Sequence, residues 1–81
     1  MNIQFATCTR STALKYLQRA LPSRAVSDTD DCAKPLLDLV EQDIVRIQDP
    51  TMYGSKIGVV PGKIWNEQHR DAVTAACKMF A

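Results

Sequence analysis

The stretch Leu36-Leu-Asp-Leu-Val-Glu-Gln-Asp-Ile-Val-Arg-Ile-Gln-Asp-Pro50 contains the change of hydrophobic period that decides the fold. Before Ile44 the apolar residues recur at the 3.6-residue spacing of a helix, and from Ile44 onward apolar and polar residues alternate, as in a half-buried strand. The alternating residues are Val45 and Ile47, which are apolar, and Arg46 and Gln48, which are polar. A helix followed directly by a strand is therefore predicted here.

The same alternation returns beyond a turn-forming segment, and this predicts a β-hairpin. Residues 49–55 (Asp-Pro-Thr-Met-Tyr-Gly-Ser) include a proline and a glycine, and after them Ile57 and Val59 alternate with Lys56 and Gly58. Pro61-Gly62 then breaks the second strand. The loop is longer than the tight two-residue kind, so the register of the two strands stays open.

Two helices are predicted before the hairpin. The first spans residues 9–21, where Thr9 or Ser11 can cap the free amides and Pro22 ends the hydrogen-bond ladder. Its apolar side consists of Ala13, Leu14, Leu17, Ala20 and Leu21. Residues 22–30 are a connector with one short turn around residues 24–26.

The second helix is predicted to begin after Asp30 or Asp31 and to run to about Gln42. Pro35 lies in or just past its first turn, which leaves open a start a few residues later. The acidic entry suits the helix macrodipole. Its buried face consists of Cys32, Ala33, Leu36, Leu37, Leu39 and Val40, and its wet face of Lys34, Asp38 and Glu41.

A last helix is predicted over residues 64–80, because its apolar residues fall within one arc of a helix. That arc consists of Trp65, Ala72, Val73, Ala76, Met79 and Phe80, and the polar side of Glu67, Arg70, Asp71, Thr74 and Lys78. The expected fold class is helix-rich α+β, with three helices and one β-hairpin.

Composition and length favour one small domain spanning residues 1–81. The chain is 46% hydrophobic and 23% charged, which is ordinary for a globular protein. Its net charge of +1 argues against a uniformly basic coat for nucleic acid or membrane. With no secretory signal, no span-length apolar run and an odd set of three cysteines, we expect a cytoplasmic protein with free thiols and no membrane contact.

The residues that could carry catalysis do not combine at useful spacings. The single histidine, His69, lies on the apolar arc of the predicted last helix, where Cys77 is too far along the helix to serve as a nucleophile, and we interpret it as a packed histidine. The cysteines and His69 are too widely separated for a zinc site built from close ligand pairs. We therefore expect no enzyme, no cofactor, no metal and no small-molecule substrate.

Two further groups have structural interpretations. Asp28, Asp30 and Asp31 lack the glycine and glutamate of a calcium loop and are read as helix-capping charge. The glycines at 54, 58 and 62 lack the Lys-Ser/Thr of a phosphate-binding loop and are read as turn and edge glycines.

The net charge conceals three blocks of opposite sign. Residues 1–25 carry +4, residues 26–49 carry −5 and residues 50–81 carry +2. Such segregation can produce two faces with different partners. Alternatively, the basic first helix and the acidic second helix neutralise each other across their contact.

Residues 36–50 together with Ser55-Lys-Ile-Gly-Val-Val60 resemble the second half of a winged helix-turn-helix domain of the multiple-antibiotic-resistance repressor type. The shared features are a helix ending in Leu-Val-Glu, a strand with an arginine, an Asp-Pro turn and a return strand. The resemblance implies that residues 31–42 take the place of the recognition helix, residues 50–56 form the wing, and residues 64–80 resemble the dimerisation helix. Two features differ from the family: there is room only for a degenerate middle helix around residues 23–26, and the recognition-helix position opens with acidic residues.

Two classes of binding function follow. The first is a small regulatory adaptor or inhibitor, of the kind that phage-like mobile elements encode as very short chains, which binds a protein partner. Its candidate residues are Asp28, Asp30, Asp31, Asp38, Glu41, Met52 and Tyr53. The alternative is a winged-helix transcriptional regulator that binds double-stranded DNA. Its candidate phosphate contacts are Arg10, Lys15, Arg19, Arg24, Lys56 and Lys63. A homodimer through residues 64–80 is compatible with either.

Overall fold

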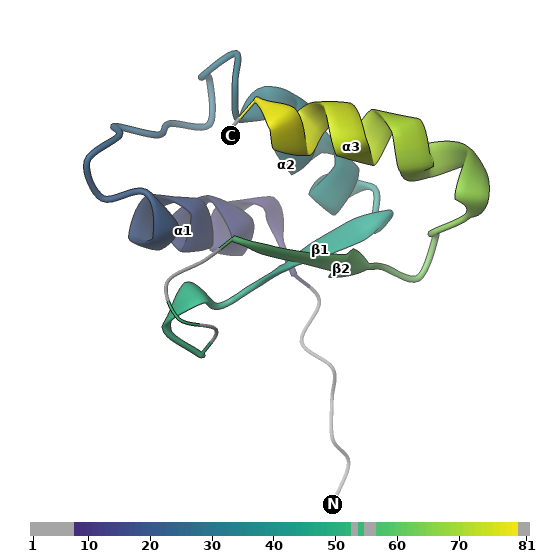
Figure 1. Cartoon of the computed structure of the whole chain (residues 1–81), viewed down its shortest axis with the longest axis horizontal. Helices are drawn as coiled ribbons and strands as arrows, with labels where there is room; N and C mark the ends of the chain where they lie inside the picture. Colours follow the sequence, from purple (N-terminus) through teal and green to yellow (C-terminus); the bar gives the residue numbers. More distant parts are fainter. Residues whose placement is uncertain (1–7, 53, 55–56, 80–81) are drawn as a thin grey trace, which may run out of the picture.

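A computed structural model describes residues 8–52, 54 and 57–79 of the chain. It confirms the α+β arrangement of three helices with one antiparallel hairpin (Figure 1). The elements in chain order are α1 (Arg10–Ala20), α2 (Lys34–Glu41), β1 (Val45–Gln48), the 3₁₀ turn η1 (Pro50–Met52), β2 (Gly58–Pro61), the 3₁₀ turn η2 (Glu67–His69) and α3 (Arg70–Lys78).

Helix α1 begins where the sequence predicts. Thr9 is extended, and its Oγ1 accepts a hydrogen bond from the N–H of Thr12 at 3.2 Å, which satisfies one of the unpaired amides of the first turn. The helix ends at Ala20, just before Pro22, and its side chains Ala13 and Leu17 are fully buried. The connector that follows contains the expected turn, with the N–H of Val26 donating to the carbonyl of Arg24.

Regular helix α2 begins at Lys34, a few residues after Asp31, which is the later start that the position of Pro35 allows. Pro35 then occupies the first turn, where its missing N–H costs nothing. Residues 31–33 instead form a turn held by Asp30, whose carboxylate accepts from the N–H of Cys32 at 2.9 Å. Ala33 is nevertheless buried in the core, as predicted.

Helix α2 connects to β1 through a tight turn centred on Asp43. Its φ of 57° lies in the left-handed region, which few residues other than glycine adopt. The turn sends the chain directly into β1, whose residues alternate between buried Val45 and Ile47 and half-buried Arg46 and Gln48. The predicted change of period at Ile44 is therefore the helix-to-strand boundary.

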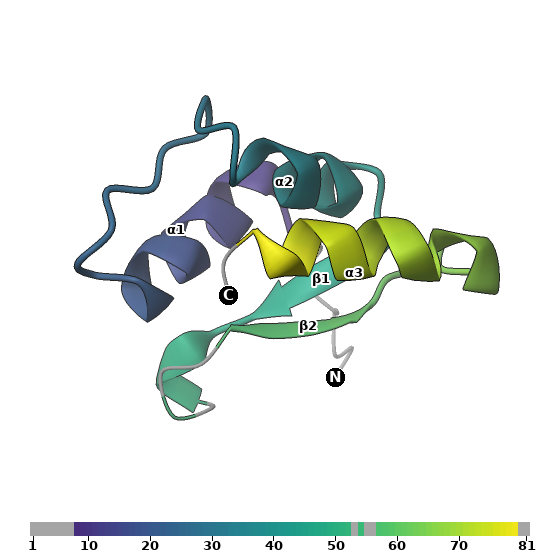
Figure 2. The ribbon, with the colours of Figure 1, turned by 45° about the horizontal axis from the view of Figure 1, so that its top comes forward.

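The hairpin pairs Val45 with Pro61, Arg46 with Val60, Ile47 with Val59 and Gln48 with Gly58. Strand β2 lies at the edge of the sheet in Figure 2, where Pro61 is tolerated. The strand ends within the predicted Pro61-Gly62 break, with Pro61 as its last member.

The last helix starts later than the sequence predicts. Residues 62–65 are tied to neighbouring backbone, because the N–H of Ile64 donates to the carbonyl of Asp43 at 2.9 Å. Asn66 then caps η2 by accepting from the N–H of Gln68 at 2.8 Å, and regular helix begins only at Arg70. Trp65 and Ile64 therefore do not lie on the helical arc, and Phe80 lies outside the described residues.

The core forms where α1 and α2 pack on each other and on β1, with α3 packed against α2 (Figure 2). Its buried apolar residues are Ala13, Leu17, Val26, Ala33, Leu36, Leu37, Val40, Ile44, Val45, Ile47 and Ala76. Helix α3 contributes only Ala76 to this set, so most of its surface stays outside the core. Within the described part of the chain, no helix has the length and hydropathy of a membrane span.

Candidate functional site

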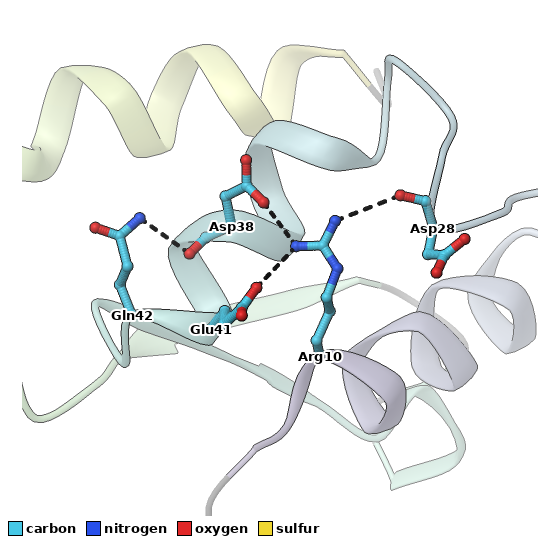
Figure 3. Close-up of polar contacts among 5 residues, drawn as sticks. All are labelled: Arg10, Asp28, Asp38, Glu41 and Gln42. Carbon is cyan, nitrogen blue, oxygen red and sulfur yellow. Dashed lines mark hydrogen bonds and ion pairs between the residues drawn. The ribbon is translucent and has the colours of Figure 1, made fainter.

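Arg10 connects the two charge blocks of the sequence (Figure 3). From the start of α1 its Nη1 donates to Oδ1 of Asp38 at 2.6 Å and to Oε2 of Glu41 at 3.2 Å, both on α2. Its Nη2 donates to the backbone carbonyl of Asp28 at 3.4 Å. The hydrogen bond to Asp38 is the main cause that raises the pKa of Arg10 above its ordinary value, while partial burial opposes it. This residue pairs with both acids across the contact of the two helices, as the second interpretation of the charge blocks expects, and its single charge offsets one of their two negative charges.

The contact joins residues that the sequence assigned to opposite functions. Arg10 is a candidate phosphate contact, whereas Asp38 and Glu41 are candidate contacts to a protein partner. Because these residues pair with each other, fewer unpaired charges remain for a phosphate among the basic candidates and for a protein partner among the acidic ones.

Two more acids of residues 26–49 have arginine partners. Asp43 contacts Nε of Arg46 at 3.5 Å, and Asp49 contacts Nη1 of Arg19 at 3.3 Å. Four of the seven acids in this block are therefore paired with arginines.

The other three acids, Asp28, Asp30 and Asp31, lie on the loop before α2. The side chains of Asp28 and Asp31 are exposed, and among the described residues none of the three carboxylates pairs with a cation. Asp30 is half-buried, and its Oδ1 accepts a hydrogen bond from the N–H of Cys32. We call Asp28, Asp30 and Asp31 the acidic loop.

Met52 does not join the acidic loop. It belongs to η1 and is 77% exposed, and Figures 1 and 2 both place η1 and the loop before α2 on opposite sides of α1. Tyr53 lies outside the described residues. The predicted protein-binding residues therefore do not form one continuous face.

The candidate phosphate contacts are also dispersed. Lys15 is exposed on α1, and Arg19 one turn later lies over the ring of Tyr16, 5.8 Å from its centroid, while it pairs with Asp49. Arg24 donates to the carbonyl of Met79 at 3.5 Å. Lys63 follows the far end of β2, and Lys56 is outside the described residues.

A shallow hollow lies on the hairpin at the end away from η1. Its volume is about 330 Å³ and its lining consists of Arg46, Pro61, Gly62 and Lys63. The sequence identified Lys63 as a candidate contact but missed Arg46. In the sequence Arg46 is a polar residue of an alternating strand and the arginine of the winged-helix resemblance, and neither pattern indicates that it lies near Lys63. The register of the hairpin brings the two residues together.

The remaining reactive groups do not assemble into a site. His69 closes η2 rather than lying on a helical arc, and its ring makes no hydrogen bond to another described residue. The three cysteines are free and half-buried, and burial raises the pKa of the Cys77 thiol. In the described ranges, no three His, Cys, Asp or Glu side chains converge on a point that could hold a metal ion.

Asp49 is stabilised in its charged form by its neighbours. The hydroxyl and the N–H of Thr51 donate to Oδ1 at 2.8 and 3.0 Å, and with the smaller contribution of Arg19 they lower the pKa of Asp49 below its ordinary value. Asp49 thereby holds η1 at the end of β1 and connects it to α1.

This pKa shift predicts a pH-dependent stability. A carboxylate favoured in the folded chain stabilises it fully above the unfolded pKa, near pH 4, and the contribution is lost as pH falls through the lower folded value. We expect Asp49→Asn, which keeps an oxygen acceptor, to be less stable than the parent at pH 7 and equally stable at strongly acidic pH. Urea unfolding of both proteins across this range measures the difference, and a gap that stays constant down to the acid limit would contradict the assignment.

Comparison with protein-family models, with curated proteins and with solved structures found no match to this chain.

Proposed function

We propose that this chain is a small non-catalytic regulatory binding protein, an adaptor or inhibitor, that docks a basic surface of a protein partner through the acidic loop. The supporting observation is the division of the acids in residues 26–49. Four are satisfied by arginines of the same chain, while Asp28, Asp30 and Asp31 are left together without a cation among the described residues.

The ion pairs of Arg10 favour the acidic loop over Asp38 and Glu41 as the docking surface. Asp38 and Glu41 already hold Arg10, so a partner would have to displace an existing ion pair to use them. Asp28 and Asp31 need no such displacement, because both are exposed. Complementary charges of this kind mainly raise the association rate and fix the orientation of docking.

The loop is also anchored, which favours its use as a recognition element. Arg10 donates to the carbonyl of Asp28, and the carbonyl of Asp30 accepts from the N–H of Ala33 and Lys34 at 3.0 and 2.9 Å. A loop held at both ends loses less conformational freedom on binding than a free one.

Charge reversal at the exposed acids tests the proposal. We expect Asp28→Lys/Asp31→Lys to lose partners that the parent captures from a cell lysate, and to weaken binding to the purified partner by about tenfold or more, because like charges then face each other. Asp30 is left intact, since its carboxylate holds the turn. Asp71→Lys on α3 is the control, because Asp71 is exposed and lies outside the loop.

The opposite result would favour the winged-helix alternative. Duplex DNA is titrated alongside at low salt, where binding through phosphates falls steeply as salt rises. Capture that is the same for the parent and for Asp28→Lys/Asp31→Lys, with salt-sensitive DNA binding by both, would overturn docking through the acidic loop.

A further inference from the structure

The hollow between Arg46 and Lys63 has the chemistry of a phosphate site. In the register of the hairpin Arg46 lies opposite Val60, so that it flanks the end of β2, where Pro61, Gly62 and Lys63 follow. Two cations, one on β1 and one in the turn that follows β2, therefore line one shallow hollow. This end of the hairpin is opposite to η1 and to the predicted wing.

Arg46 is held with part of its guanidinium unused. Its Nε contacts Oδ1 of Asp43 at 3.5 Å, and among the described residues Nη1 and Nη2 have no partner. The side chain as a whole is 21% exposed, and neither Nη1 nor Nη2 is a buried atom without a partner, so both remain accessible to a ligand. A planar guanidinium with two free NH₂ groups matches the paired oxygens of a phosphate.

The backbone beneath the hollow is constrained. Asp43 has a left-handed φ and its carbonyl accepts from the N–H of Ile64, while the N–H of Gly62 donates to the carbonyl of Ile44 at 2.8 Å. Gly62 packs directly on the Asp43 backbone, because a Cβ at residue 62 would lie 2.7 Å from the Asp43 carbonyl carbon. These contacts fix where Lys63 leaves the sheet relative to Arg46.

The local charge favours an anion. Arg46 and Lys63 contribute two positive charges, Asp43 removes one, and the exposed Lys63 can adjust to a ligand. The volume of about 330 Å³ lies at the lower end of the range for small-ligand pockets. A phosphate with an attached sugar fits this size better than a large cofactor does.

We propose that this hollow binds a phosphate group carried by a nucleotide or by a nucleic-acid strand, with Arg46 as the bidentate contact and Lys63 as the second cation. The site goes beyond docking through the acidic loop, since it uses none of the same residues. Either function can fail without the other.

Titration followed by amide NMR spectra tests the site. Inorganic phosphate, a nucleoside monophosphate and a single-stranded oligonucleotide are added to the full chain, with chloride keeping the ionic strength constant. We expect saturable shifts centred on the amides of Gly62 and Lys63. Tighter binding of the oligonucleotide identifies a strand as the source of the phosphate, and equal binding of the monophosphate identifies a nucleotide.

Variants separate the site from general charge. Lys63→Gln is expected to weaken binding by about threefold and Arg46→Gln by about tenfold, because a bidentate charged contact is worth more than a single flexible one. Lys78→Gln removes an exposed cation on α3, which belongs to no candidate site, and is expected to leave binding unchanged. Lys63 is exposed, so its variant folds even if Arg46→Gln does not. The proposal is overturned if phosphate causes no saturable shift at residues 61–63, or if Lys78→Gln weakens binding as much as Lys63→Gln does.

Discussion

Leu37→Ala is expected to lower the free energy of unfolding by about 3 kcal/mol, because it opens a cavity in the centre of the core. Leu37 is 0% exposed and lies on α2, the helix that packs against α1, α3 and β1 together. Surrounded by three elements, the site has little freedom to collapse around the missing atoms. For a domain of this size, the loss is a large part of a total stability of about 5–15 kcal/mol.

Urea unfolding of the parent and the variant measures this effect, with an unchanged slope required for the comparison. Ile64→Ala is the control, because Ile64 is 57% exposed and its truncation is expected to change stability by about 0.5 kcal/mol or less. If both variants lost the same small amount, α2 would not be the central element of the core.

Gly62→Ala is expected to destabilise the chain by about 2–4 kcal/mol, because the added methyl group overpacks a site where backbone meets backbone. Its nearest neighbours would be the carbonyl group and the carboxylate of Asp43. Relief requires Asp43 and Gly62 to move apart, which breaks the hydrogen bonds from Gly62 to Ile44 and from Ile64 to Asp43. The amide at residue 62 is expected to lose protection from hydrogen exchange.

Gly54→Ala provides the matched control. Nothing lies within 4 Å of a Cβ at Gly54, so that its cost is only the strain of a side chain at a φ of 70°. That strain is worth about 1 kcal/mol. Thermal unfolding ranks the two variants, and a Gly62→Ala protein as stable as Gly54→Ala would show that the α2–β1 turn and the end of β2 are not in contact.

The elements that depend on near neighbours were predictable from the sequence. The α1 cap at Thr9 and the end of that helix before Pro22 follow from residues within one turn of each boundary. The switch from α2 to β1 follows from hydrophobic period, which burial of one face imposes directly on the sequence. The hairpin follows from the same alternation on both sides of a turn.

Helix boundaries that depend on distant contacts were not predictable. The apolar residues of 64–80 do recur at helical spacing in the sequence. In the structure, however, the N–H of Ile64 donates a hydrogen bond to the carbonyl of Asp43, some twenty residues earlier in the chain. Asn66 supplies the cap that starts the turn before α3. Ile64 and Trp65 fit the helical spacing of the sequence, but their backbone hydrogen bonds keep them outside the helix.

The candidate sites also divide into features set by near neighbours and features set by distant contacts. The sequence by itself determined the fold class, the helix-to-strand switch and the three blocks of charge, because each depends on short-range pattern or on composition. Only the tertiary structure decided which charges are satisfied: Arg10 pairs with Asp38 and Glu41, Arg19 with Asp49, and the acidic loop remains without a cation among the described residues. It also brought Arg46 beside Lys63. The physical reason is that pairing depends on distance in space, and the hairpin register and the packing of α1 on α2 set those distances between residues far apart in the chain.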